Sequence, residues 1–140
     1  MSFQVIVYIL TALAAVVVVL TRVRLGRGGG GGTIEVGSNL LGLHTVAGGL
    51  ALITWLAFLF APDDSAFGGD LMGVLALLFW WLTVAAGLLI LVRWLPSRGR
   101  HASAQDDDEW SEGPGLSILA HVGMLVGVGV FTWVYLTGRV

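Results

Sequence analysis

Apolar residues dominate four long stretches of the chain, and short stretches rich in glycine, proline and charge separate them. The apolar stretches cover about residues 3–20, 40–60, 71–95 and 116–136, and only the third contains a formally charged residue, Arg93. Each is close to the roughly 20 apolar residues that a helix needs to cross a hydrocarbon core of ~30 Å. The pattern predicts an all-α, multi-pass integral membrane protein. Its single domain, residues 1–140, is expected to be a four-helix transmembrane bundle.

The residues between the spans suit connectors. A run of glycines at 28–32 follows the first span and predicts a flexible linker. Pro62 opens a short acidic turn after the second span, and Pro96 is expected to stop the third helix. Pro114 precedes the fourth span, where proline suits the first turn of a helix.

The arginines predict the orientation of the bundle. The expected loops 21–39 and 96–115 hold most of them, and the loop between the second and third spans holds none; the loop arginines are Arg22, Arg24, Arg27, Arg98 and Arg100. Positive residues favour the cytoplasmic side, so both loops are predicted to be cytoplasmic and both termini to face outward, with Arg139 as the exception. The expected location is the cell (plasma) membrane.

Composition narrows the function classes. The chain is 56% hydrophobic and 11% charged, whereas soluble domains carry about a quarter charged residues. It has no cysteine, which excludes disulfides, thiolate metal sites and a cysteine nucleophile. Its net charge of -2 argues against nucleic-acid binding. No carboxylate lies inside a span and no catalytic motif is present, so we do not expect an enzyme; at most the chain is an electron-transfer subunit of an oxidoreductase.

Two histidines occupy matching positions in the second and fourth spans. His44 is the fifth residue of its span and His121 the sixth of its own, and both spans run outward from the cytoplasm. Both rings are therefore expected roughly 6–8 Å below the cytoplasmic boundary. In an up-down-up-down bundle these helices lie on a diagonal of about 13 Å, which suits a macrocycle held between two axial imidazoles. One hypothesis for the pair, as the alternative to interhelical hydrogen bonding, is haem iron ligation, with Arg93 near the level of the propionates.

The faces around the histidines are compatible with this hypothesis. Small residues follow His44 and larger apolar ones follow His121 at the same helical offsets: Ala47, Gly48 and Ala51, and then Met124, Leu125 and Val128. The arrangement resembles, in architecture, the small four-helix membrane cytochromes b, whose ligand positions His44 and His121 would match. It departs from a two-haem pattern, because His101 falls in a loop. The alternative is that the histidines form interhelical hydrogen bonds and that Arg93 is a snorkelling anchor or lipid contact.

Glycines predict close helix contacts. Gly123 and Gly127 form a small-xxx-small pair and are candidate interface residues, and further close approaches are offered by Gly48, Gly49, Gly73 and Gly87. The first functional hypothesis is a non-catalytic integral membrane subunit, without cofactor, that packs with other subunits in a larger assembly such as a respiratory complex. The alternatives are a haem b electron-transfer protein using His44 and His121, and a small channel or carrier.

Overall fold

The protein is all-helical. The computed structural model describes residues 2–26, 38–98 and 114–140, and the side chains of 2–19, 39–92 and 118–140 within them. Its four helices are α1 (Phe3–Gly26), α2 (Ser38–Phe60), α3 (Asp70–Arg98) and α5 (Pro114–Leu136).

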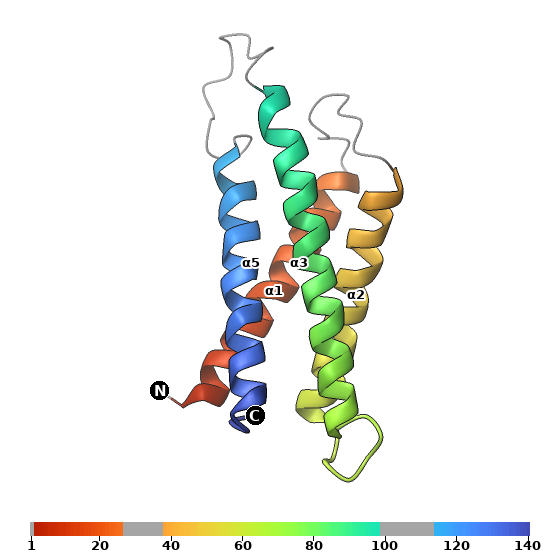
Figure 1. Cartoon of the computed structure of the whole chain (residues 1–140), viewed down its shortest axis with the longest axis vertical. Helices are drawn as coiled ribbons and strands as arrows, with labels where there is room; N and C mark the ends of the chain where they lie inside the picture. Colours follow the sequence, from red (N-terminus) through yellow and green to blue (C-terminus); the bar gives the residue numbers. More distant parts are fainter. Residues whose placement is uncertain (1, 27–37, 99–113) are drawn as a thin grey trace.

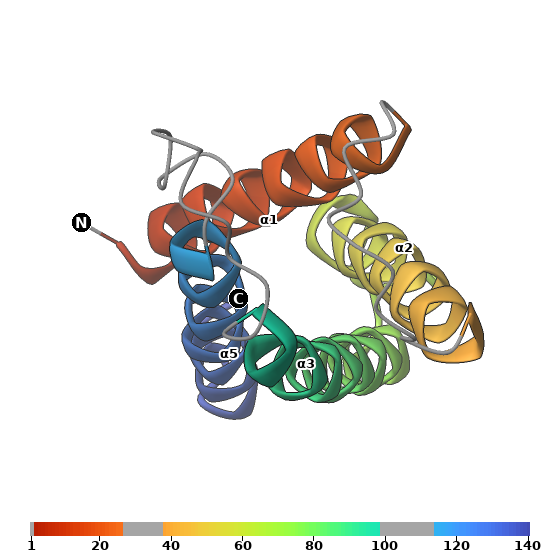
Figure 2. The same cartoon turned by 90° about the horizontal axis from the view of Figure 1, so that it is seen from above.

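The helices form an up-down-up-down bundle. In Figure 1, α2 and α5 run from the upper end to the lower end, while α1 and α3 run in the opposite direction. Seen along the bundle in Figure 2, the helices follow one another around a ring in chain order, which places α2 diagonally opposite α5. The α2–α3 pair packs most extensively, and α1 makes much sparser contacts with α2 and α5. The diagonal placement of the two histidine-bearing helices is confirmed.

Three of the helices are long and apolar enough to cross a membrane: Asn39–Phe60 in α2, Asp70–Val92 in α3 and Ile118–Leu136 in α5. The apolar part of α1, Phe3–Val19, is shorter. Many large apolar side chains point outward from the bundle, as lipid contact requires. The fourth span and the N-out orientation stay predictions.

Two helix ends differ from the sequence-based expectation. The first helix continues past residue 20 to Gly26, so Arg22 and Arg24 belong to its last turns and not to a connector. Pro96 does not stop α3, which ends at Arg98. Proline near a helix end keeps a helical φ and removes only one of the last hydrogen bonds, so the helix can close beyond it.

Aromatic side chains fill the centre of the bundle. Trp55 from α2, Trp80 from α3 and Phe131 from α5 are fully buried, and their rings bridge the space between the helices. Trp55 stacks on Phe131 with ring centroids 4.7 Å apart, and Trp80 meets the same ring at 5.8 Å. Such large rings allow the diagonal helices to stay apart while the core remains packed.

Two tryptophan–threonine hydrogen bonds tie neighbouring helices together. The Trp55 indole N–H on α2 donates to Thr11 Oγ1 on α1 over 3.1 Å, and that hydroxyl donates to its own helix at Val7 O. The same arrangement joins α3 to α5, where Trp81 donates to Thr132 Oγ1 over 3.1 Å. Each threonine satisfies an indole donor that lipid and apolar side chains cannot.

Candidate two-histidine site

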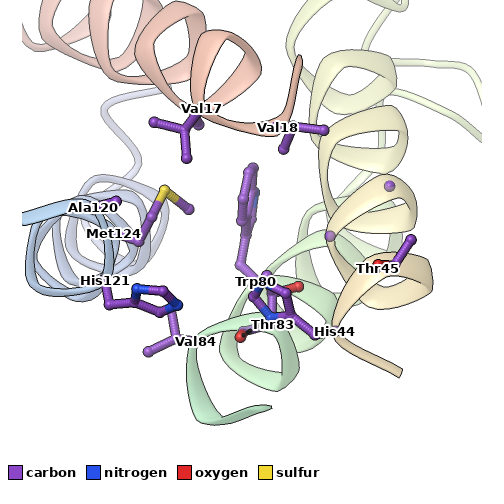
Figure 3. Close-up of a pocket in the computed structure, with 13 residues that line it drawn as sticks. Val17, Val18, His44, Thr45, Trp80, Thr83, Val84, Ala120, His121 and Met124 are labelled. Carbon is purple, nitrogen blue, oxygen red and sulfur yellow. Dashed lines mark hydrogen bonds between the residues drawn. The ribbon is translucent and has the colours of Figure 1, made fainter. Parts of the chain in front are cut away.

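The bundle brings His44 and His121 together. They extend from α2 and α5 toward one another beside α3 (Figure 3), with ring centroids 6.1 Å apart and ring planes inclined by 26°. Both side chains are half-buried. The sequence-based pairing of these two residues at one level of the bundle is confirmed.

A backbone carbonyl orients the His44 ring. His44 Nδ1 lies 3.0 Å from the Thr83 carbonyl oxygen of α3. A carbonyl only accepts, so the ring proton is on Nδ1 and the lone pair is on Nε2. This is the arrangement that metal-bound histidines commonly use, because the second hydrogen bond fixes both the tautomer and the ring direction.

Gly87 of α3 lies against both rings. A Cβ atom built on it would be 2.8 Å from His121 Cδ2, 3.1 Å from His121 Nε2 and 3.0 Å from His44 Cε1. Carbon atoms do not normally approach so closely, so a side chain at position 87 would displace at least one ring.

Of the predicted close approaches, those at Gly87 and at Gly73 are confirmed; Gly73 lies against the rings of Tyr135 and Phe58. Around Gly49 the space is open.

A cavity of about 140 Å³ adjoins the histidine pair. Apart from the histidines and threonines its wall is mainly apolar; it is formed by Ala14, Val17, Val18, His44, Thr45, Gly48, Gly49, Trp80, Thr83, Val84, Ala120, His121 and Met124. Figure 3 shows the Trp80 indole standing between α3 and α1 in this space. Trp80 Nε1 is buried and has no hydrogen-bond acceptor within the described part of the chain. A molecule or water in the cavity could supply one.

Comparison with protein-family models, with curated proteins and with solved structures finds no match to this chain. The described part of the site offers a metal two imidazoles, and Met124 adds a thioether sulfur to the same cavity wall. No group of three or more His, Cys, Asp or Glu side chains occurs among the described residues.

The other residues predicted for the site have mixed outcomes. Gly48 and Met124 do line the cavity, whereas Ala47 and Ala51 are buried elsewhere in the bundle. Leu125 is not part of a wall facing the cavity, because its side chain is exposed on the bundle surface. The cause is the rotation of successive residues around the helix axis. Leu125, four residues after His121, is turned 40° to one side of it and faces outward, whereas Met124, three residues after it, is turned 60° to the other side and faces the cavity.

The remaining predictions concern Arg93 and two glycines. Arg93 lies in α3, but its side chain is outside the described part of the structure, as is His101. Gly127 is buried and Gly123 is exposed, and no atom lies within 4 Å of a Cβ built on either. The interface role of this glycine pair stays a prediction.

Sequence reasoning did not connect Thr83 or Gly87 with the histidines. The signal was present: these residues lie four positions apart on α3, so they share one face, and they are a polar and a small residue within a stretch of large apolar ones. What the sequence lacked was the rotation of α3 relative to its neighbours.

Proposed function

We propose that the protein holds one haem b between His44 and His121 and carries electrons in the membrane. The observation that carries the proposal is the spacing of the rings. With metal–nitrogen bonds of about 2.0–2.1 Å, and about 1.2 Å from a ring nitrogen to its centroid, two imidazoles on one metal have centroids about 6.4 Å apart. The distance between His44 and His121 is 6.1 Å.

The number of ligands favours haem over a free metal ion. A structural zinc site needs four protein ligands and a catalytic one needs three. His44 and His121 supply two imidazoles, which is the number that iron requires when a porphyrin already supplies four nitrogens. Haem would supply reversible one-electron chemistry at this position.

Three features of the surrounding residues favour such a group, although the cavity itself is too small for it. The Thr83 carbonyl leaves the His44 Nε2 lone pair available, since it takes the proton on Nδ1. Alanine, valine and methionine side chains make the cavity wall mainly apolar, and the polarity around a haem helps to set its reduction potential. In the orientation that the arginines predict, the histidine end of the bundle is cytoplasmic and α3 carries Arg93 on that side.

The bundle must widen to take a porphyrin. Its cavity of about 140 Å³ is smaller than the roughly 300–1,000 Å³ of pockets that enclose drug-sized ligands. The wall best able to move is α1, which contributes Ala14, Val17 and Val18 and packs sparsely on its neighbours. Binding is therefore expected to couple to an outward displacement of α1. The α3 backbone must also withdraw, because the Cβ position of Gly87 lies 3.0 Å from His44 Cε1 and 3.1 Å from His121 Nε2, between the two rings.

The test is the optical spectrum of the protein expressed with ample haem and purified in detergent. We expect a reduced-minus-oxidised α-band of low-spin haem b, at about one haem per chain. His44→Ala and His121→Ala should each abolish that band. Thr45→Ala is the matched control, because Thr45 lines the same cavity without belonging to the pair.

A second variant separates ligation from folding. His44→Met supplies a different axial ligand, and a methionine–histidine pair raises the reduction potential of haem. We expect retained haem at a higher potential. Wild-type protein that is folded but lacks haem after such expression would show that the histidines serve only as hydrogen-bonding groups.

The orientation can be tested with thiol labels, because the chain contains no cysteine. A membrane-impermeant reagent applied outside the cell should label Ser2→Cys and Ser65→Cys but not Ser97→Cys. The reverse pattern would place the histidine pair at the outer face of the membrane. Partner subunits, which an electron carrier requires as donor and acceptor, would be recovered by copurification in mild detergent.

A further inference from the structure

We propose that His44 and His121 bind a single cuprous ion, Cu(I), in the bundle as it stands, before any movement of α1 or α3. The inference goes beyond the proposed haem function and does not rest on it. It concerns a monovalent ion, which occupies far less space than a macrocycle and is satisfied by two ligands.

The α3 backbone at Gly87 lies beside the place where the two rings meet. The position that a Gly87 Cβ would occupy is 3.1 Å from His121 Nε2 and 3.0 Å from His44 Cε1, an atom bonded to His44 Nε2. The nitrogen-bearing edges of both rings are therefore close to one point of α3. A macrocycle extends around its metal in every direction of its plane and would meet this backbone, whereas a bare ion would not.

The spacing of the rings fits an ion held by two nitrogens. Two imidazoles in line on one metal have centroids about 6.4 Å apart when the bonds have the length of those to four-coordinate zinc, and the observed distance is 6.1 Å. Bonds to a two-coordinate ion are shorter, which brings the expected distance closer to the observed one. His44 also has the orientation of a metal ligand: its Nδ1 lies 3.0 Å from the Thr83 carbonyl oxygen, so the lone pair is on Nε2.

The ligand set selects the ion. Binding by two nitrogens in line is typical of the closed-shell monovalent ions Cu(I) and Ag⁺, whereas Zn²⁺ takes three or four protein ligands and Cu(II) favours a tetragonal set. The described residues contain no group of three or more His, Cys, Asp or Glu side chains that could supply such a set. Met124 adds a soft thioether to the cavity wall, which also suits Cu(I).

The charge of the ion leads to the same choice. Neutral imidazoles leave the full charge of the metal on the complex. The free-energy cost of moving an ion out of water rises with the square of its charge, so a divalent ion held by the same two ligands is disfavoured far more strongly in an apolar setting. The wall beside the pair is mainly apolar, which favours the monovalent ion.

The experiment is a titration of haem-free, detergent-purified protein with Cu(I) under anaerobic conditions, in competition with a chromogenic Cu(I) chelator. We expect one Cu(I) per chain, and at least tenfold weaker binding in His44→Ala and in His121→Ala. Gly87→Ala should also weaken binding at least tenfold, because its methyl group would displace a ring. Thr45→Ala and Gly49→Ala are the controls, because both positions line the same cavity and no atom lies within 4 Å of the Cβ position of Gly49. Binding as in wild type is expected for both.

A measurement with Ag⁺ needs no variant. This ion shares the preference of Cu(I) for two nitrogens in line. Adding it to isotope-labelled wild-type protein should shift the Nε2 nuclear magnetic resonance signals of His44 and His121 together, in proportion to one ion per chain. A shift of one ring alone, or of neither, would overturn the proposal even if the alanine variants fail to fold. Zn²⁺ should bind at least tenfold more weakly than Cu(I), and equal affinities would contradict the choice of a monovalent ion.

The outcomes separate this inference from the proposed function. Histidine-dependent Cu(I) binding by protein that takes up no haem would support the copper site and refute the haem proposal. A haem α-band in a protein whose haem-free form binds no Cu(I) would do the reverse. If both ligands bind, haem-loaded protein should no longer bind Cu(I), because each ligand uses the same two nitrogens. Undiminished Cu(I) binding by haem-loaded protein would show that the ion lies elsewhere.

Discussion

The hydrogen bond between Trp55 and Thr11 should contribute measurably to the stability of the bundle. Thr11→Val keeps the shape of the side chain and removes the hydroxyl that accepts from the buried Trp55 Nε1, 3.1 Å away. Leaving a buried donor without an acceptor lowers the free energy of unfolding by about 1–3 kcal/mol. Hydrogen bonds between membrane helices contribute about 0.6 kcal/mol on average and about 1.7 at most, which lowers the expectation to about 1–2 kcal/mol for the single substitution.

A double-mutant cycle isolates the pair. Trp55→Phe removes the donor, so Thr11→Val should cost little in that background, and the coupling energy should be about 0.6–1.7 kcal/mol. The assay is reversible unfolding of the detergent-solubilised protein, followed by helical circular dichroism. Thr54→Val is the matched control, because that hydroxyl donates only within its own helix, to Leu50 O and Ala51 O. The control coupling energy comes from combining Thr54→Val with Trp55→Phe. A coupling energy for Thr11 and Trp55 that cannot be distinguished from this control value would refute the reasoning.

Three further predictions use the same unfolding assay. Trp80→Phe should cost about 0.5–1.5 kcal/mol less than Trp55→Phe, because both indoles are fully buried but only that of Trp55 makes a hydrogen bond; equal costs would contradict this. Gly73→Ala should destabilise the protein by about 1–3 kcal/mol, since its methyl group would overlap the Tyr135 ring, and an unchanged stability would show that the ring moves freely. Arg139→Gln should lose about 0.5–1 kcal/mol, because the guanidinium lies 4.3 Å from the Phe3 ring centroid and 4.7 Å from that of Trp133. A loss confined to low salt would indicate a screened charge–charge interaction and argue against a cation–π contact.

The sequence predicts the helices of this protein better than their rotations. Long apolar stretches identified all four elements, and the matched offsets of His44 and His121 predicted their meeting. Helices α3 and α5 carry apolar residues on all sides, so their hydropathy does not reveal which face turns inward. For that reason Leu125 was placed in a wall that it does not join, and neither Thr83 nor Gly87 was linked to the histidines.

Helix ends were also difficult to predict, for a different reason. Hydropathy marks where a helix leaves the apolar region and does not mark where its hydrogen bonding stops. Arginine is a good helix former, so α1 continues through Arg22 and Arg24 to Gly26. In α3, Pro96 lies close enough to the end that its missing N–H removes little.

The arrangement of the bundle explains why α3 governs the histidine site. The backbones of α2 and α5 stay apart across the diagonal, and the large rings of Trp55 and Phe131 keep them so. The histidines therefore cannot fix each other's position through their own helices. Each instead contacts α3, His44 through the Thr83 carbonyl and His121 at Gly87. The relative position of the two rings therefore depends on α3 more than on the helices that carry them.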